Sequence, residues 1–191
     1  MNITDFLITL VPFSHDELND ILPCFEKENV QKNQVLIKEG QVCNKLYFIE
    51  QGLGRSYYLK EDGKEVTQWF SGAGKFMASV DSYFNQSPSL YYLEVLEDSV
   101  LYSISYENMD LLLVKYHKME KFIRLLSLEM FTKIIYKLNA IQFHTARERY
   151  DYMISEFPNI AHRVPLSQIA SFLGMTQETL SRIRRNGQKI Q

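Results

Sequence analysis

A run of polar side chains near the end of the 191-residue chain carries the chemistry needed to read DNA bases. Gln177, Glu178, Ser181, Arg182 and Arg185 are chemically suited to base edges in the major groove and to phosphate oxygens. Arginine can donate two hydrogen bonds to guanine, glutamine pairs with adenine, and a carboxylate accepts from the amino group of cytosine. The set predicts a surface that touches double-stranded DNA.

These side chains need a rigid support, and the residues around them predict two short helices joined by a sharp turn. Gly174 allows the turn, because glycine tolerates positive φ. Thr176 is a suitable N-cap, with Thr179 behind it. Ala170 lets the helices approach closely, as a helix-turn-helix requires. The facing apolar residues would be Ile169, Ala170 and Leu173 on the first helix and Leu180 and Ile183 on the second. A plain helical hairpin with a polar face is the alternative.

The distribution of charge agrees with a DNA-binding role. The segment 163–191 holds five basic residues and one acidic residue, whereas the first 162 residues hold 16 basic and 22 acidic ones. An acidic body with a small basic tail is typical of a regulator that touches nucleic acid. A solvated helix end would give the same pattern, so charge alone leaves both interpretations open.

Apolar residues at steps of three and four predict one long helix from about Met119 to Ile141. The main stripe contains Met119, Ile123, Leu126, Met130, Ile134, Leu138 and Ile141, and a second stripe beside it contains Phe122, Leu125, Phe131 and Ile135. A helix with two apolar faces must bury one of them elsewhere. We therefore expect it to pack against its own domain and against the same helix of a second copy. A central helix buried within one chain is the alternative.

Short apolar runs broken by turn residues, from about Val30 to Ile104, predict an all-β barrel or sandwich. Glu61–Lys64 predicts a hairpin turn that uses Gly63. The pattern becomes helical after Tyr106, so the fold class is α+β. The expected domains are a sensor barrel at 1–116, a dimerisation helix at 117–141 and a winged-helix-like DNA-binding domain at 142–191.

The segment between the long helix and the helix-turn-helix predicts one further helix and a connector. The helix should run from about Thr145 to Glu156, because Pro158 prevents continuation. Asn159–Val164 is predicted to be extended, and any strand pair of a wing is expected there.

The stretch Leu36–Gly52 contains an apolar pair, a glycine, a small residue, four apolar residues and a second glycine. This order and spacing resemble the first signature of cyclic-nucleotide-binding domains. With the long helix and the helix-turn-helix, the whole chain resembles the Crp/Fnr family of transcription regulators. The resemblance implies an antiparallel β-barrel of the jelly-roll kind. It also implies a homodimer that binds a palindromic operator and contacts RNA polymerase. It implies base reading by Gln177, Glu178 and Arg182, and phosphate contacts by Thr176, Thr179, Ser181 and Arg185.

Members of that family that bind cyclic AMP use a Gly-Glu pair for the ribose hydroxyl and an arginine for the cyclic phosphate. The matching region, Gly72–Tyr92, has neither glutamate nor arginine. A buried phosphate without a charged partner is costly, so no ordinary response to cyclic AMP is expected. The polar candidates for another effector are Lys75, Ser79, Ser87, Ser89 and Tyr91. Binding of a cyclic nucleotide through these groups, and a pocket filled by aromatic residues such as Tyr83 and Phe84, are the alternatives.

Other classes of protein are disfavoured. Cys24 and Cys43 are too few for an iron–sulfur or structural zinc site. The lack of histidine between Val30 and Ile104 argues against a cupin-like barrel enzyme, the least favoured alternative. Neither a catalytic site nor a cofactor is therefore expected. Neither a targeting segment nor an apolar run of roughly 18 residues is found, so a cytoplasmic protein without a membrane segment is expected.

Overall fold

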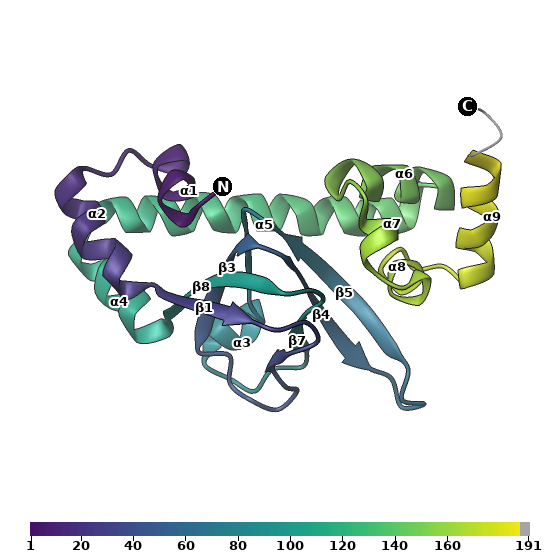
Figure 1. Ribbon diagram of the computed structural model, residues 1–191, viewed down its shortest axis with the longest axis horizontal. Coiled ribbons are helices and arrows are strands. Elements are labelled where there is room, and N and C mark those ends of the chain that lie inside the picture. The colour runs from purple at the N-terminus through teal and green to yellow at the C-terminus, as the bar shows by residue number, and fades with distance from the viewer. Residues whose placement is uncertain (188–191) are drawn as a thin grey trace. The chain divides into compact units, whose positions relative to one another are not determined.

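The computed structural model describes residues 1–187 and shows an α+β chain (Figure 1). The chain forms two compact units. The first contains Met1–Ser56 and Phe70–Glu129, and the second contains Tyr57–Trp69 and the chain from Met130 onward. No helix within residues 1–187 is long and apolar enough to span a membrane. The functional domain limits that we expect, at 116/117 and 141/142, stay predictions.

The strands of the described chain form two four-stranded sheets, in the orders β1-β8-β3-β6 and β2-β7-β4-β5. Their bounds are β1 Glu26–Val30, β2 Val35–Ile37, β3 Lys45–Gln51, β4 Leu53–Leu59, β5 Glu65–Gly72, β6 Lys75–Met77, β7 Tyr92–Val95 and β8 Ser99–Ser105. Strand β8 pairs antiparallel with β1 and β3, with Leu46 opposite Ile104 in the β3 pair. The predicted antiparallel barrel of short strands is confirmed, in the form of a two-sheet sandwich.

The turn between β4 and β5 lies where the sequence predicts it. The Gly63 N–H donates to the Lys60 carbonyl at 2.8 Å, and the Lys60 N–H donates to the Lys64 carbonyl at 3.0 Å. Gly63 has φ +77°, a conformation that favours glycine.

Helices surround the sheets and continue the chain beyond them. Their bounds are α1 Ile3–Leu10, α2 His15–Ile21, the short 3₁₀ helix η1 Leu22–Cys24, α3 Val80–Asn85, α4 Tyr106–Lys115, α5 His117–Phe143, α6 Ala146–Glu156, α7 Ile160–Arg163, α8 Leu166–Phe172 and α9 Gln177–Gly187. The predicted long helix is confirmed and has 27 residues. Helix α6 begins at a capping box, in which Thr145 and Glu148 satisfy each other's backbone N–H groups.

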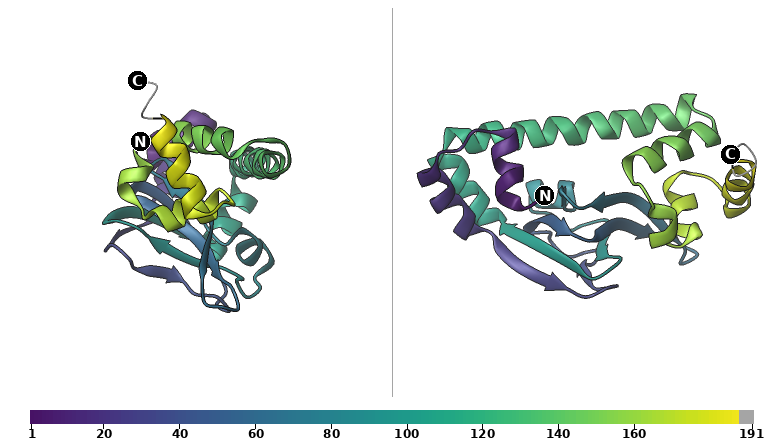
Figure 2. Two further views of the ribbon diagram at one scale, coloured as in Figure 1. Left: turned by 90° about the vertical axis from the view of Figure 1, so that its right-hand side faces the viewer. Right: turned by 45° about the horizontal axis from the view of Figure 1, so that its top comes forward.

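Four phenylalanines join the helices to the sheet in the first unit. The ring of Phe6 on α1 lies 5.1 Å from Phe48 on β3, 5.6 Å from Phe76 on β6 and 6.3 Å from Phe122 on α5, between centroids. Helix α1 accordingly lies beside the amino-terminal half of α5 (Figure 2). Such aromatic contacts contribute beyond the area they bury. Phe122, from the second apolar stripe of the long helix, thus packs within its own chain.

The extended connector and wing predicted at Asn159–Val164 are wrong, because this segment forms α7. Asn159 adopts φ +66°, which asparagine tolerates, so a new helical turn begins directly after Pro158. The Val164 N–H then donates to the Ile160 carbonyl at 3.1 Å. The turn buries Ile160 completely and Val164 almost completely, and this apolar burial stabilises a helix over an extended chain.

Candidate nucleic-acid interface

Helix α8 ends in a turn that directs the chain into α9. The Met175 N–H donates to the Ala170 carbonyl at 3.0 Å, and the Gly174 N–H donates to the Ser171 carbonyl at 3.2 Å. These two bonds form a Schellman motif, which requires a left-handed residue after the helix. Gly174 supplies it, with φ +64°. The predicted sharp turn at Gly174 is thereby confirmed.

Helix α9 is fixed at its start and along one side. The Thr179 N–H donates to the Thr176 hydroxyl at 3.2 Å, so Thr176 is the N-cap that the sequence predicts. Leu180 is fully buried and packs in the same core as Ile169 and Ala170 of α8. The α8–α9 pair is therefore a helix-turn-helix held by an apolar contact.

The opposite side of α9 carries the predicted reading residues. Gln177, Glu178, Arg182 and Arg185 are exposed, and Ser181 is half-buried. Because successive helical residues are separated by about 100°, these five side chains lie within one arc of roughly 140°. Of the caps, Thr176 is exposed and Thr179 is half-buried. A hydrogen bond from the Thr176 side chain lowers the pKa of Glu178.

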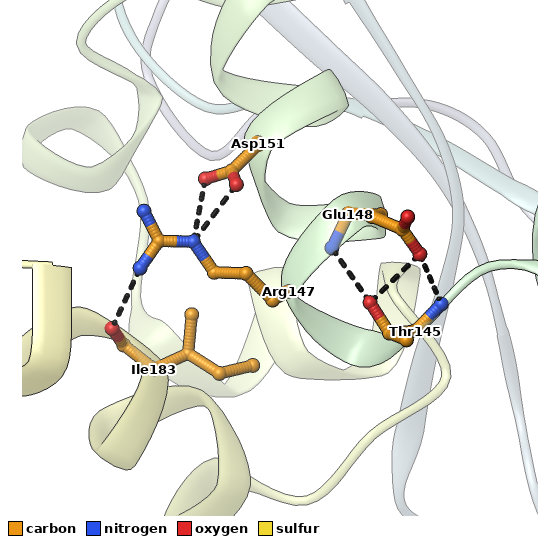
Figure 3. A network of polar contacts seen from close by, with 5 residues as sticks. All are labelled: Thr145, Arg147, Glu148, Asp151 and Ile183. Atoms are coloured by element: carbon orange, nitrogen blue, oxygen red, sulfur yellow. Dashed lines mark hydrogen bonds and ion pairs between the residues drawn. The ribbon is translucent and has the colours of Figure 1, made fainter.

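Helix α6 contacts α9 through a charged network (Figure 3). The Arg147 Nε donates to both carboxylate oxygens of Asp151, at 3.0 and 2.8 Å. The same guanidinium reaches the Ile183 carbonyl on α9 at 3.5 Å. This arginine lies within the α6 capping box, between Thr145 and Glu148, so the start of α6 and the middle of α9 are linked.

The second unit also contains a contact between the β4–β5 hairpin and α8. The Thr67 N–H donates to the Ser171 hydroxyl at 3.1 Å. The Lys137 ammonium on α5 lies 4.4 Å from the ring centroid of Phe172 and 5.5 Å from that of Trp69, and it donates to the Gln68 carbonyl. Burial lowers the pKa of Lys137 to about 8. The first helix of the helix-turn-helix is thus packed against a cation held between two aromatic rings.

In the first unit, the predicted effector residues form hydrogen bonds to one another. The Ser89 hydroxyl lies 2.8 Å from both the Ser79 hydroxyl and the Tyr91 carbonyl. The Ser87 carbonyl accepts from the buried Ser82 hydroxyl. Ser79 and Ser89 are only 2% and 1% exposed. The structure therefore brings together the Ser79 and Ser89 hydroxyls and the main chain of Tyr91.

Cations of the barrel are paired with carboxylates. Lys75 Nζ lies 2.7 Å from the Glu129 carboxylate on α5. Arg55 Nε lies 2.6 Å from the Glu94 carboxylate, and these side chains are 2% and 12% exposed. Of the aromatic residues that could fill the pocket, Tyr83 is fully buried, Tyr91 and Tyr92 are half-buried, and Phe84 is 46% exposed.

Comparison with known proteins decides the family. Residues 27–116 match the family described as Cyclic nucleotide-binding domain. The fumarate and nitrate reduction regulatory protein of Vibrio cholerae is 30% identical over 188 residues, which cover 91% of this chain and 72% of that protein. The chain belongs to the Crp/Fnr family. The anaerobic regulatory protein of Haemophilus influenzae is similar too, with 28% identity over 92% of this chain and 71% of that protein.

The fold agrees with membership of the Crp/Fnr family. A crystal structure of a Crp/Fnr-family transcriptional regulator from Eubacterium rectale superposes with a TM-score of 0.71, over 96% of this chain and 88% of that one. At 17% identity this likeness concerns the fold alone. As a member of this family, the chain is a DNA-binding transcription regulator.

In this Crp/Fnr-family chain, the carboxyl-terminal half of α5 has an exposed apolar face. Phe131, Leu138 and Ile141 are 61%, 51% and 57% exposed, and Ile134 is 47% exposed. The other residues of the predicted dimer contact are less exposed. Met119 and Leu126 are buried in their own chain, and Ile123 and Met130 are half-buried. The exposed face therefore begins near Phe131, whereas the main apolar stripe predicted from the sequence begins at Met119.

The sequence interpretation did not identify the arginines of α6 or the buried Arg55–Glu94 pair. Arg147 reaches a carbonyl 36 positions away, and Arg55 meets a carboxylate 39 positions away. The spacing of residues in the chain carries no signal for such contacts, since they depend on how strands and helices pack.

Proposed function

We propose that the protein is a homodimeric regulator that inserts α9 of each subunit into the major groove of a palindromic operator. The exposed arc of α9, supported by the buried Leu180, is the observation that carries this proposal. Two such helices related by two-fold symmetry require half-sites roughly 34–36 Å apart. The proposal includes a contact with RNA polymerase. It also includes a cytoplasmic location, because transcription takes place in the cytoplasm.

Within this proposal the arc has two parts. Gln177, Glu178 and Arg182 read base edges, because their side chains are exposed and carry the appropriate donors and acceptors. Phosphate contacts come from the remaining polar residues, which are Thr176, Thr179, Ser181 and Arg185.

The exposed face of α5 forms the dimer contact in this proposal. Phe131, Ile134, Leu138 and Ile141 follow one another at steps of three and four. This spacing places them on one side of the helix, as in a two-helix seam. An exposed apolar strip of this kind marks an interaction site, and a second copy supplies a matching strip.

Selection from a library of random duplexes tests the DNA-binding proposal. Enrichment of a palindrome is expected, together with an affinity that falls steeply as salt rises, because cations on α9 displace counterions. The Arg182→Ala variant should bind the selected site about 1–3 kcal/mol more weakly and lose preference at one base pair. Arg124→Ala, the same change at an exposed position of α5, serves as control and should bind normally.

Two results would contradict these roles. A flat salt titration of the wild-type protein would exclude binding through phosphates. An equal loss of affinity for every sequence in Arg182→Ala would make this residue a phosphate contact instead of a base reader.

The proposal also includes a barrel that does not respond to cyclic nucleotides. The Ser89 hydroxyl is bonded to the Ser79 hydroxyl and to the main chain of Tyr91, and Lys75 already has the carboxylate of Glu129. Titration of cyclic AMP and of cyclic GMP into the dimer by calorimetry should give no heat up to millimolar concentration. Micromolar binding of either would instead support the second candidate, a ligand-dependent regulator, for which the match of residues 27–116 is the supporting observation.

A further inference from the structure

We infer that Arg149 is a positioning residue for DNA reading, which ties the turn of the helix-turn-helix to the end of α5. The inference rests on the proposed function of α9. Arg149 lies on α6, and its side chain is half-buried. The Arg149 Nε donates to the Leu173 carbonyl at 3.0 Å, and its Nη1 donates to the His144 carbonyl at 2.9 Å.

Both carbonyls lie at the carboxyl end of a helix. The last carbonyls of a helix have no partner within it. In the α8 turn, the Schellman bonds use the carbonyls of Ala170 and Ser171, and Arg149 supplies a donor to the carbonyl of Leu173, two residues after Ser171. His144 directly follows α5, and its own N–H still donates to the Ala140 carbonyl.

A guanidinium suits this place for two reasons. The negative ends of two helix dipoles meet there, so a cation is stabilised by both. The planar fork of arginine can hold two acceptors in fixed directions, whereas the ammonium of lysine cannot reproduce that geometry. The two bonds are charge-assisted and therefore stronger than neutral ones.

The position of Leu173 explains why this tether matters for α9. Leu173 is the C-cap of α8, and Thr176, the cap of α9, follows three residues later. A shift of the Leu173 carbonyl would therefore turn the start of α9 relative to α5. Arg147, two residues earlier on α6, adds a longer contact to the Ile183 carbonyl (Figure 3). Helix α6 thus contacts the turn that leads into α9, through Arg149, and the middle of α9, through Arg147.

The test compares two substitutions of Arg149 on a selected palindromic duplex and on a duplex of mixed sequence. Arg149→Lys keeps the charge but loses the fork, and Arg149→Gln loses both. Affinity for the palindrome should fall about tenfold or more in each. Affinity for the mixed duplex and the salt dependence should not change. Arg185→Ala is the comparator. For this variant, the slope of the logarithm of affinity against the logarithm of salt concentration (the salt slope) should shrink by about 0.9, as expected for one lost phosphate contact.

Three results would overturn the inference. Wild-type affinity of Arg149→Lys for the palindrome would mean that only the charge matters. A salt slope of Arg149→Gln that shrinks as in Arg185→Ala would make Arg149 a phosphate contact. The third result comes from NMR of the wild-type protein, where the Nε–H proton of Arg149 should exchange with water much more slowly than that of Arg182. Equal exchange rates would exclude the tether.

The NMR measurement needs neither a variant nor DNA, so it holds even where a substitution prevents folding. It also distinguishes a failure of the Arg149 tether from a failure of the proposed DNA-binding function. A wild-type protein that fails to bind any duplex would reject the proposed function, while slow exchange at Arg149 would still establish the link between α5, α6 and α8.

Discussion

Replacement of Glu94 by alanine should lower the free energy of unfolding of the first unit by about 3–5 kcal/mol, because it leaves a buried cation without its carboxylate. Arg55 is 2% exposed and lies 2.6 Å from Glu94. A charge in such a place cannot recover its hydration, so the cost of removing one partner exceeds the net contribution of the pair.

Thermal unfolding followed by circular dichroism measures this effect, with two matched variants. Glu50→Ala removes a carboxylate from a looser pair, in which Lys27 lies 3.7 Å away and is 53% exposed. That change should cost no more than about 0.5 kcal/mol. The double variant Arg55→Met/Glu94→Leu removes both charges and should regain most of the loss. Equal stability of Glu94→Ala and Glu50→Ala would show that the buried pair does not matter.

The buried pair also bears on how the barrel is stabilised. Strands β4 and β7 carry Arg55 and Glu94, so the cation and the carboxylate are contributed by neighbouring strands of one sheet. A barrel whose charged groups satisfy each other can fold without an anionic ligand. A bound cyclic phosphate would have to compete with Glu94 for Arg55 or with Glu129 for Lys75. The proposed lack of response to cyclic nucleotides is thus consistent with the packing.

Local patterns predicted much of the fold and of the candidate site. The turn at Gly174 and the cap at Thr176 depend on residues only a few positions apart, so the amino-acid sequence alone predicts both. The burial of Leu180 and the exposure of Arg182 follow from helical periodicity in the same way.

Features that depend on tertiary packing were predicted poorly. The long helix has two apolar stripes, and periodicity does not say which one the barrel covers. Met119 and Leu126 are buried in their own chain, whereas Ile134 stays exposed. The α7 turn was missed because the burial of Ile160 and Val164 outweighs the extended preference of a polar connector that follows a proline. The tether of Arg149 joins two helix ends that are distant in sequence.

Replacement of Leu138 by lysine should convert the proposed dimer into monomers. Leu138 is 51% exposed and is flanked by Ile134 and Ile141 on the same side of α5. In a two-fold seam the substitution places two like charges against each other, at a cost of several kcal/mol. The dissociation constant of the dimer should rise at least about 100-fold, as measured by sedimentation velocity. Affinity for the palindromic duplex should fall with it, since one subunit reads only one half-site.

Asn139→Lys is the matched control, because it adds the same charge at an exposed neighbour that lies roughly 100° around the helix axis. It should remain dimeric. Leu126→Lys separates the seam from the core. Leu126 is 7% exposed, so this change should destabilise the first unit instead of merely dissociating the dimer. Stable dimers of Leu138→Lys, or monomers from Asn139→Lys, would place the contact between subunits on another face.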